Sequence, residues 1–150
     1  RIRAVLDHEV KTANQPYYYM LDLASVEEDA GNEDKAVEWL ERAYRESKGV
    51  ATRFQWGTEY VFGLVRMKPE DGGRIRDAAV AVLGELDGPD RIYMRTASRL
   101  KRLVTRLREW NQSGKHDAEM AALRERMSGI CGRIPAADAA RKTCDGFLAT

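Results

Sequence analysis

The sequence predicts an all-α domain of about seven to eight helices. Apolar residues recur at spacings of three and four from end to end, and runs that alternate with a period of two are absent. Glycines follow the periodic stretches, where the C-terminal end of a helix favours a left-handed residue. Prolines stand near the starts of helices, where a fixed φ and a missing N–H are tolerated. The glycines are Gly31, Gly49, Gly88, Gly114 and Gly132, and the prolines are Pro16, Pro69, Pro89 and Pro135.

These signals divide the 150-residue chain into helical segments that we expect to form one domain, residues 1–150. A chain of this length buries enough surface to form a stable core without disulfides or metal sites. The chain begins at Arg1 without an initiator methionine, so we interpret it as the C-terminal fragment of a longer protein. The expected helices are 1–13, 16–30, 33–47, 50–67, 69–87, 89–112, 115–131 and a short one at 137–147.

The second and third segments carry small residues where two helix backbones must touch. Ala24 lies in the first helix, Gly31 in the turn, and Ala36 and Ala43 in the second helix beside the larger Leu40. This spacing resembles the tetratricopeptide repeat, a helix–turn–helix unit that stacks into solenoids. The match is partial, because Met20 and Glu27 stand where the repeat carries aromatic residues. We expect one regular unit in an irregular, tetratricopeptide-like right-handed solenoid of antiparallel helix pairs.

Residues 50–67 are apolar over an unusually wide arc, which predicts the buried central helix. Gly57 and Gly63 lie inside this helix, where each costs about 1 kcal/mol relative to alanine. We therefore expect both glycines to permit close contact with a neighbouring helix. In the next segment, Gly72 and Gly73 interrupt the expected start, so that helix is predicted to begin as late as Arg74.

The helix predicted after Pro89 carries a row of arginines. Their spacing of three and four confines them to roughly 80° of the helix surface, and apolar residues occupy the opposite face. Arginine forks bind carboxylates and phosphates through paired hydrogen bonds, so we identify the row as a candidate partner-binding surface. Its members are Arg91, Arg95, Arg99, Arg102 and Arg106.

Three interpretations of the row remain open. The first is a row that is solvated or paired internally with the acidic segment 27–41. The second is a row that binds an acidic protein partner. The third, a row that binds nucleic acid, is disfavoured because no aromatic residues for base stacking are interleaved with the arginines.

Two cysteines, Cys131 and Cys144, lie near the C-terminus. Their spacing fits neither a redox CxxC motif nor half of a zinc ribbon, and the chain has only two histidines, so no metal site is expected. On spacing alone, a disulfide and two reduced core cysteines remain equally open.

Several strings resemble the C-terminal helical region of exported bacterial proteins of the thioredoxin family, in which tetratricopeptide-like helices follow a thioredoxin-like domain. The strings are ATRFQWGTEYVFGLVRMKPED at 51–71, GPDRIYMRT at 88–96, LREWNQSGKHDAE at 107–119 and ICGRIPAADAARKTCDGFLA at 130–149. The resemblance implies a periplasmic or otherwise exported protein whose redox cysteine pair lies upstream. The periplasm is an oxidising compartment, so the resemblance also favours a Cys131–Cys144 disulfide.

Bulk composition narrows the function classes. The net charge of +1 creates no global field toward nucleic acid or anionic membrane, and no apolar stretch reaches the roughly 20 residues that span a bilayer. Phosphate-binding loops, nucleophile elbows and metalloprotease motifs are absent, and no cofactor is expected.

The resulting hypothesis is a non-enzymatic helical-repeat domain that docks a protein partner or scaffolds a neighbouring thioredoxin-like domain. The parent chain would then be the oxidoreductase. One alternative is an accessory thiol–disulfide module that acts through Cys131 and Cys144, and another is a purely structural cap.

Overall fold

The computed structural model describes residues 2–12 and 16–149 and is all-helical over that part of the chain. Arg1 and Ala13, at the ends of the first predicted helix, lie outside the described residues. The helices are α1 (Ile2–Thr12), α2 (Tyr17–Asp29), α3 (Glu33–Glu46), α4 (Val50–Met67), α5 (Gly72–Gly84), α6 (Met94–Trp110), α7 (Asp117–Gly132) and α8 (Ala139–Leu148), with a 3₁₀ turn η1 (Gln112–Gly114) between α6 and α7.

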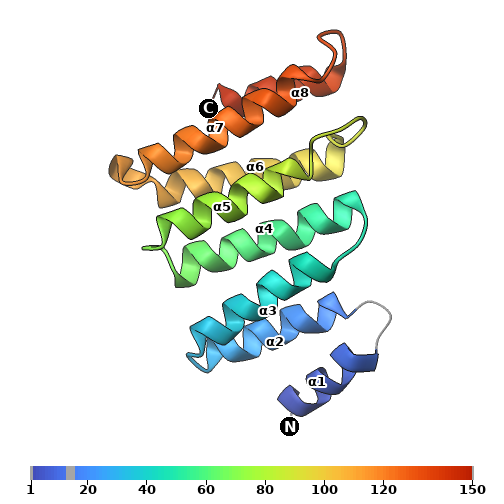
Figure 1. Ribbon diagram of the computed structural model, residues 1–150, viewed down its shortest axis with the longest axis vertical. Coiled ribbons are helices and arrows are strands. Elements are labelled where there is room, and N and C mark those ends of the chain that lie inside the picture. Colours follow the sequence, from blue (N-terminus) through green and yellow to red (C-terminus); the bar gives the residue numbers. More distant parts are fainter. Residues whose placement is uncertain (1, 13–15, 150) are drawn as a thin grey trace.

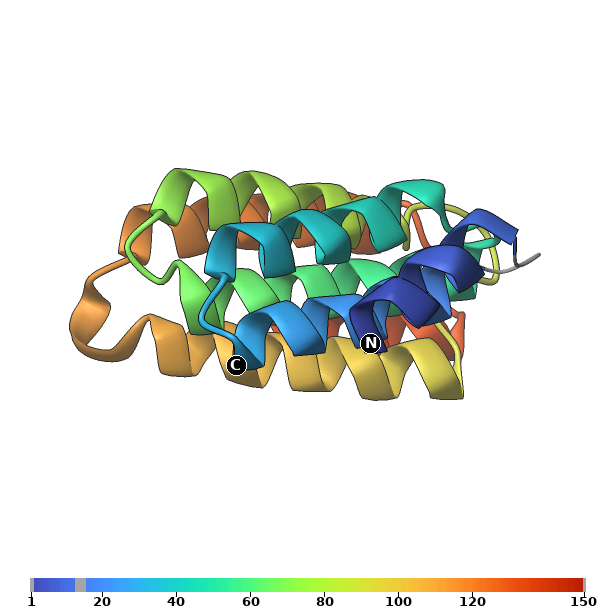
Figure 2. The same cartoon turned by 90° about the horizontal axis from the view of Figure 1, so that it is seen from below.

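The helices stack in chain order, from α1 at one end to α7 and α8 at the other (Figure 1). Seen from below, α3, α5 and α7 form one layer and α2, α4 and α6 the other (Figure 2). Consecutive helices pack on one another from α1 to α5, and α6 and α7 each contact the preceding helix of their own layer. These contacts are compatible with the predicted stacking of antiparallel helix pairs.

The α2–α3 pair packs through the small residues that predicted it. Ala24, Ala36 and Ala43 are buried, and Gly31 has a φ of +81°, which favours glycine at the turn. Glu27, where the repeat pattern carries an aromatic residue, is only 3% exposed. Its carboxylate pairs with Arg3 of α1 at 2.6 Å and accepts a hydrogen bond from Asn32 Nδ2 at 2.7 Å. The departure from the repeat pattern therefore anchors α1 to the pair.

Helix α4 is the buried centre, as its sequence predicts. Phe54, Trp56 and Leu64 are almost fully buried. A Cβ at Gly57 would lie 2.7 Å from Val82 Cγ2 of α5, and one at Gly63 would overlap Leu40 Cδ1 of α3. Both glycines thus allow the close helix contacts that the sequence predicts.

Two predicted helix starts are wrong by a few residues. Helix α5 begins at Gly72, where the Asp71 carboxylate accepts a hydrogen bond from the Arg74 backbone N–H at 3.3 Å. Helix α6 begins at Met94 and not at residue 89, because Tyr93 is extended and Asp90 has a φ of +59°. Thr96 Oγ1 accepts a hydrogen bond from the Tyr93 backbone N–H at 3.0 Å and so caps the new start.

Candidate functional site: the α6 arginine row

Four of the five predicted arginines share one face of α6, and Arg91 does not. Arg95, Arg99, Arg102 and Arg106, here called the arginine row, follow one another at helical spacing on α6. Arg91 lies in the preceding loop, where its Nη1 donates to the Glu85 carbonyl at 3.2 Å. It is tied to the C-terminal end of α5, so we leave it out of the row.

The arginine row borders the core of α6 instead of lying opposite to it. The buried residues of α6 are Thr96, Leu100, Leu103 and Leu107. Leu103 precedes Arg106 by three residues and follows Arg99 by four, which places it beside the row on the helix surface. The arginines therefore extend across the neighbouring helix α4 as well as into solvent.

Phe62 of α4 supports the C-terminal half of the arginine row. The guanidinium carbon of Arg102 lies 5.7 Å from the centroid of the Phe62 ring, and that of Arg106 lies 5.4 Å from it. Phe62 is 5% exposed, so its ring is fixed by the core. Cation–π contact with a fixed ring restricts both side chains without neutralising their charge.

Arg99 is the most enclosed member of the arginine row, with 22% of its side chain exposed. Its Nη1 lies 4.0 Å from Glu59 Oε1, at the outer limit of an ion pair. Burial lowers the pKa of the Arg99 guanidinium below its ordinary value. The negative charge of Glu59 raises this pKa, and the positive charges of Arg102 and Arg95 lower it further. The cation remains charged, as arginine does in proteins, and is incompletely compensated.

The acidic segment 27–41 does not compensate the arginine row. Glu28 of α2 pairs with Arg66 of α4 at 2.8 Å, and Asp34 pairs with Lys68 at 2.7 Å. Glu41 accepts a hydrogen bond from Tyr60 at 2.7 Å, and Glu27 pairs with Arg3. Over the described residues, the internal pairing that the sequence left open is not found, and Glu59 is the single carboxylate that reaches the row.

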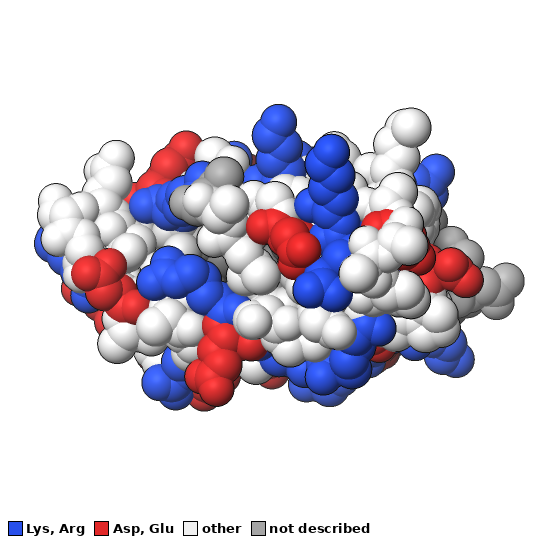
Figure 3. Space-filling model, turned by 90° about the horizontal axis from the view of Figure 1, so that it is seen from above, with Lys and Arg blue, Asp and Glu red and all other residues white. Residues whose placement is uncertain are grey.

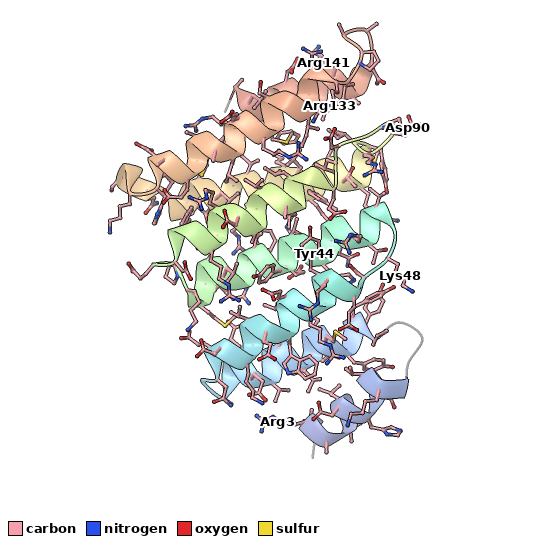
Figure 4. The ribbon with its side chains drawn as sticks, viewed as in Figure 1. Arg3, Tyr44, Lys48, Asp90, Arg133 and Arg141 are labelled. Atoms are coloured by element: carbon pink, nitrogen blue, oxygen red, sulfur yellow. A yellow bond between two sulfur atoms is a disulfide. The ribbon has the colours of Figure 1, made fainter. Side chains whose placement is uncertain are left out.

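A second polar cluster joins α3, α4 and α5, and sequence reasoning missed it. Glu85 receives both Nε and Nη2 of Arg53, at 3.1 and 3.2 Å, and accepts a hydrogen bond from the Tyr44 hydroxyl at 2.8 Å. Tyr44 projects from α3 in Figure 4. Residues separated by 32 and 41 positions give no local signal of this kind, so only the fold brings them together.

An open hollow of about 720 Å³ is lined by Tyr44 and Arg53 of this cluster and by Tyr60 of α4. Burial, followed by the hydrogen bond to Glu85, raises the pKa of the Tyr44 hydroxyl. Burial and the hydrogen bond to Glu41 raise the pKa of Tyr60 to about 12. Both hydroxyls therefore stay protonated at neutral pH and donate to carboxylates across the helix contacts, so they stabilise the packing of α3, α4 and α5.

A separate cleft of about 490 Å³ lies where the α5–α6 and α7–α8 loops meet. Its apolar lining includes Ile92, Ile130 and Ile134, and Asp87 stands at its edge. Arg133 donates to Asp87 from two nitrogens, at 2.9 and 2.7 Å, which holds the two loops together. Figure 4 shows Asp90 and Arg133 at this same end of the molecule.

The molecule seen from above, onto the α7 and α8 end, carries both signs of charge. Lysine and arginine side chains are interspersed there with acidic ones (Figure 3). This face therefore has no field of a single sign, in contrast to the arginine row on α6.

The two cysteines are joined by a disulfide between α7 and α8. The Cα atoms of Cys131 and Cys144 lie 5.6 Å apart, within the usual range for a disulfide. The two residues are 1% and 0% exposed. Among the described residues, no group of three or more His, Cys, Asp or Glu side chains is arranged to hold a metal ion. None of the helices in that part of the chain has the length and apolar character needed to cross a membrane.

Comparison with protein-family models, with curated proteins and with solved structures finds no match. The resemblance to exported thioredoxin-family proteins therefore stays a prediction from the sequence strings.

Proposed function

We propose that this chain is a non-enzymatic helical-repeat interaction domain that docks an acidic segment of a protein partner on the arginine row. One observation carries the proposal: four arginines share a face of α6, and among the described residues only one carboxylate, 4.0 Å from Arg99, reaches them. Three of these residues, Arg95, Arg102 and Arg106, are exposed.

The arginine row suits a carboxylate-rich ligand for two physical reasons. Each guanidinium presents a planar fork of donors that matches a carboxylate. Contact with Phe62 orders Arg102 and Arg106 before binding, so less side-chain entropy is lost when a ligand arrives. An acidic segment would replace an unfavourable row of like charges with paired ones.

The cellular context remains part of the proposal. The sequence strings favour an exported protein in which this domain positions a thioredoxin-like neighbour on its client. The alternative of an accessory thiol–disulfide module gains no support from the buried sulfurs, because exchange requires access for the attacking thiolate. A purely structural cap would bind no ligand, which separates it from the docking proposal.

Fluorescence anisotropy with a labelled oligoglutamate peptide tests the proposal. The variant Arg95→Glu/Arg99→Glu/Arg102→Glu should weaken binding at least about tenfold, and a matching oligoglutamine peptide should not bind. The control Lys48→Glu/Lys115→Glu/Lys142→Glu makes the same change in net charge at exposed positions outside the row. Equal losses in the two variants would show that net charge alone acts and would overturn the proposal, as would a lack of binding by the unmodified domain.

A further inference from the structure

Helix α8 is attached to the rest of the domain by a small contact. It has ten residues, too few for a helix to be stable alone in water. Cys144 is its one buried residue, whereas Ala140, Phe147 and Leu148 are half-buried. The most deeply buried part of α8 is therefore the cysteine that the disulfide holds.

The polar side chains of α8 contribute little to its attachment. Arg141 pairs with Asp145 of the same helix at 3.1 Å, and its Nη1 donates to the Ile134 carbonyl at 3.0 Å. The Asp138 carboxylate accepts a hydrogen bond from the Ala140 backbone N–H at 2.9 Å. These bonds order α8 and its own loop without tying them to α6 or to the body of α7.

Apolar side chains of α6 and α7 lie beneath the C-terminal end of α8. Leu107, Met120, Leu123 and Met127 are each less than 9% exposed and line a hollow of about 230 Å³ together with Phe147 and Leu148. The hollow shows that α8 covers this surface without filling it. Loss of α8 would expose a contiguous apolar groove between α6 and α7.

We propose that the Cys131–Cys144 disulfide is a redox latch, and that its reduction releases α8 and uncovers the α6–α7 groove. The reductant is a dithiol, whose first thiolate attacks one sulfur and forms a mixed disulfide. The second thiol of the reductant then displaces that sulfur. Cys131 and Cys144 leave as two thiols, the reductant leaves as its disulfide, and two electrons and two protons are transferred.

Burial of both sulfurs sets the conditions under which the latch opens. Any thiolate, from a monothiol or a dithiol, reaches them only after a local opening of α8. A dithiol then completes the reduction because its second thiol resolves the mixed disulfide, whereas a monothiol such as glutathione should reduce the bond slowly. This behaviour separates a latch from a disulfide that exchanges with clients. The latch is independent of the arginine row, and either idea can fail without the other.

Hydrogen exchange measured by mass spectrometry tests the latch. The oxidised domain is compared with the same protein reduced by dithiothreitol and with the variant Cys131→Ser/Cys144→Ser. Amides of residues 139–148 should exchange about a hundredfold faster in the two forms that lack the disulfide, because the bond no longer restricts the loop between the cysteines. The amides of α4 should keep their protection. Binding of a hydrophobic dye should increase in parallel.

Three outcomes would overturn the latch, two of them measured after reduction and one in a variant that keeps the disulfide. Unchanged protection of α8 after reduction would show that the bond is not what holds it, and equal loss of protection in α4 would make the disulfide a staple of the whole domain. The variant Phe147→Ala/Leu148→Ala keeps the bond and removes the apolar contacts. This variant should raise the exchange rate of the α8 amides less than reduction does. A larger rise would show that Phe147 and Leu148, and not the disulfide, hold α8 in place.

Discussion

Arg99 of α6 and Glu59 of α4 face one another across the edge of the core, with 4.0 Å between Nη1 and Oε1. Both side chains are less than a third exposed. At this distance Glu59 compensates part of one positive charge in a row of four. It is also the group with which the proposed acidic ligand would compete for Arg99.

The variant Glu59→Gln should therefore tighten the binding of an oligoglutamate peptide. Removing the competing carboxylate leaves Arg99 free to pair with the ligand, and the expected gain is about two- to fivefold. Titration by fluorescence anisotropy at low salt measures it. The control Glu125→Gln removes the same charge from an exposed position on α7. If both variants gain equally, the effect is one of net charge and Glu59 has no local role.

The helices of this protein follow from its local pattern, and its polar clusters do not. Periodicity, together with glycine and proline, predicted α2, α3 and α4 to within one residue at each end, because the 3.6-residue period is a property of the segment itself. The start of α6 was missed because it depends on Thr96 capping Tyr93, which competes with an otherwise helical pattern.

The candidate site was predicted in part for the same reason. Helical spacing placed four arginines on one face, whereas the support from Phe62 and the approach of Glu59 depend on how α4 packs on α6. At Glu27 the local pattern was misleading. A charged residue there departs from the repeat, which carries an aromatic residue, but in the fold Glu27 forms an ion pair with Arg3 of α1.

The buried tyrosines should make the domain sensitive to alkaline pH. Tyr60 has a folded-state pKa of about 12 against an ordinary value of 10.0, and the pKa of Tyr44 is also raised. Above pH 10 the unfolded chain loses these protons first, so the stabilisation is complete below pH 10 and is lost as the pH rises to 12. Tyr60 alone should account for roughly 2 kcal/mol over this window.

Urea unfolding at a series of pH values, with phenolate absorbance as a second readout, measures this effect. Tyr44 and Tyr60 should ionise above the ordinary tyrosine pKa of 10.0 in the folded protein. The variant Tyr60→Phe should remove one late titration and flatten the fall in stability. A phenolate titration that Tyr60→Phe leaves unchanged above pH 10 would contradict the prediction.

The Glu85 carboxylate should be the most sensitive charged group of the α3–α4–α5 cluster. The substitution Glu85→Gln removes the charge that Arg53 meets with two hydrogen bonds and weakens the acceptor for Tyr44. With 17% of the Glu85 side chain exposed, we expect the free energy of unfolding to fall by about 1–3 kcal/mol. Glu46→Gln serves as the control, because its pair with Arg42 is an i,i+4 contact within one helix and is more exposed than the Arg53–Glu85 pair. Chemical denaturation should show a loss below about 0.5 kcal/mol for this control.

Two glycines in helix interiors should respond in opposite directions to alanine. Helix propensity alone favours both substitutions by about 1 kcal/mol. At Gly129 of α7, a Cβ meets nothing closer than Arg133 at 3.8 Å, so Gly129→Ala should raise the free energy of unfolding by about 0.5–1 kcal/mol. At Gly63 of α4, a Cβ overlaps Leu40 Cδ1 in the α3 contact, and this overpacking should outweigh the propensity gain and give a net loss of about 1–2 kcal/mol. Chemical denaturation of the two variants measures both values. A stabilising Gly63→Ala would mean that Leu40 repacks freely and that glycine is not required for the close approach of α3 and α4.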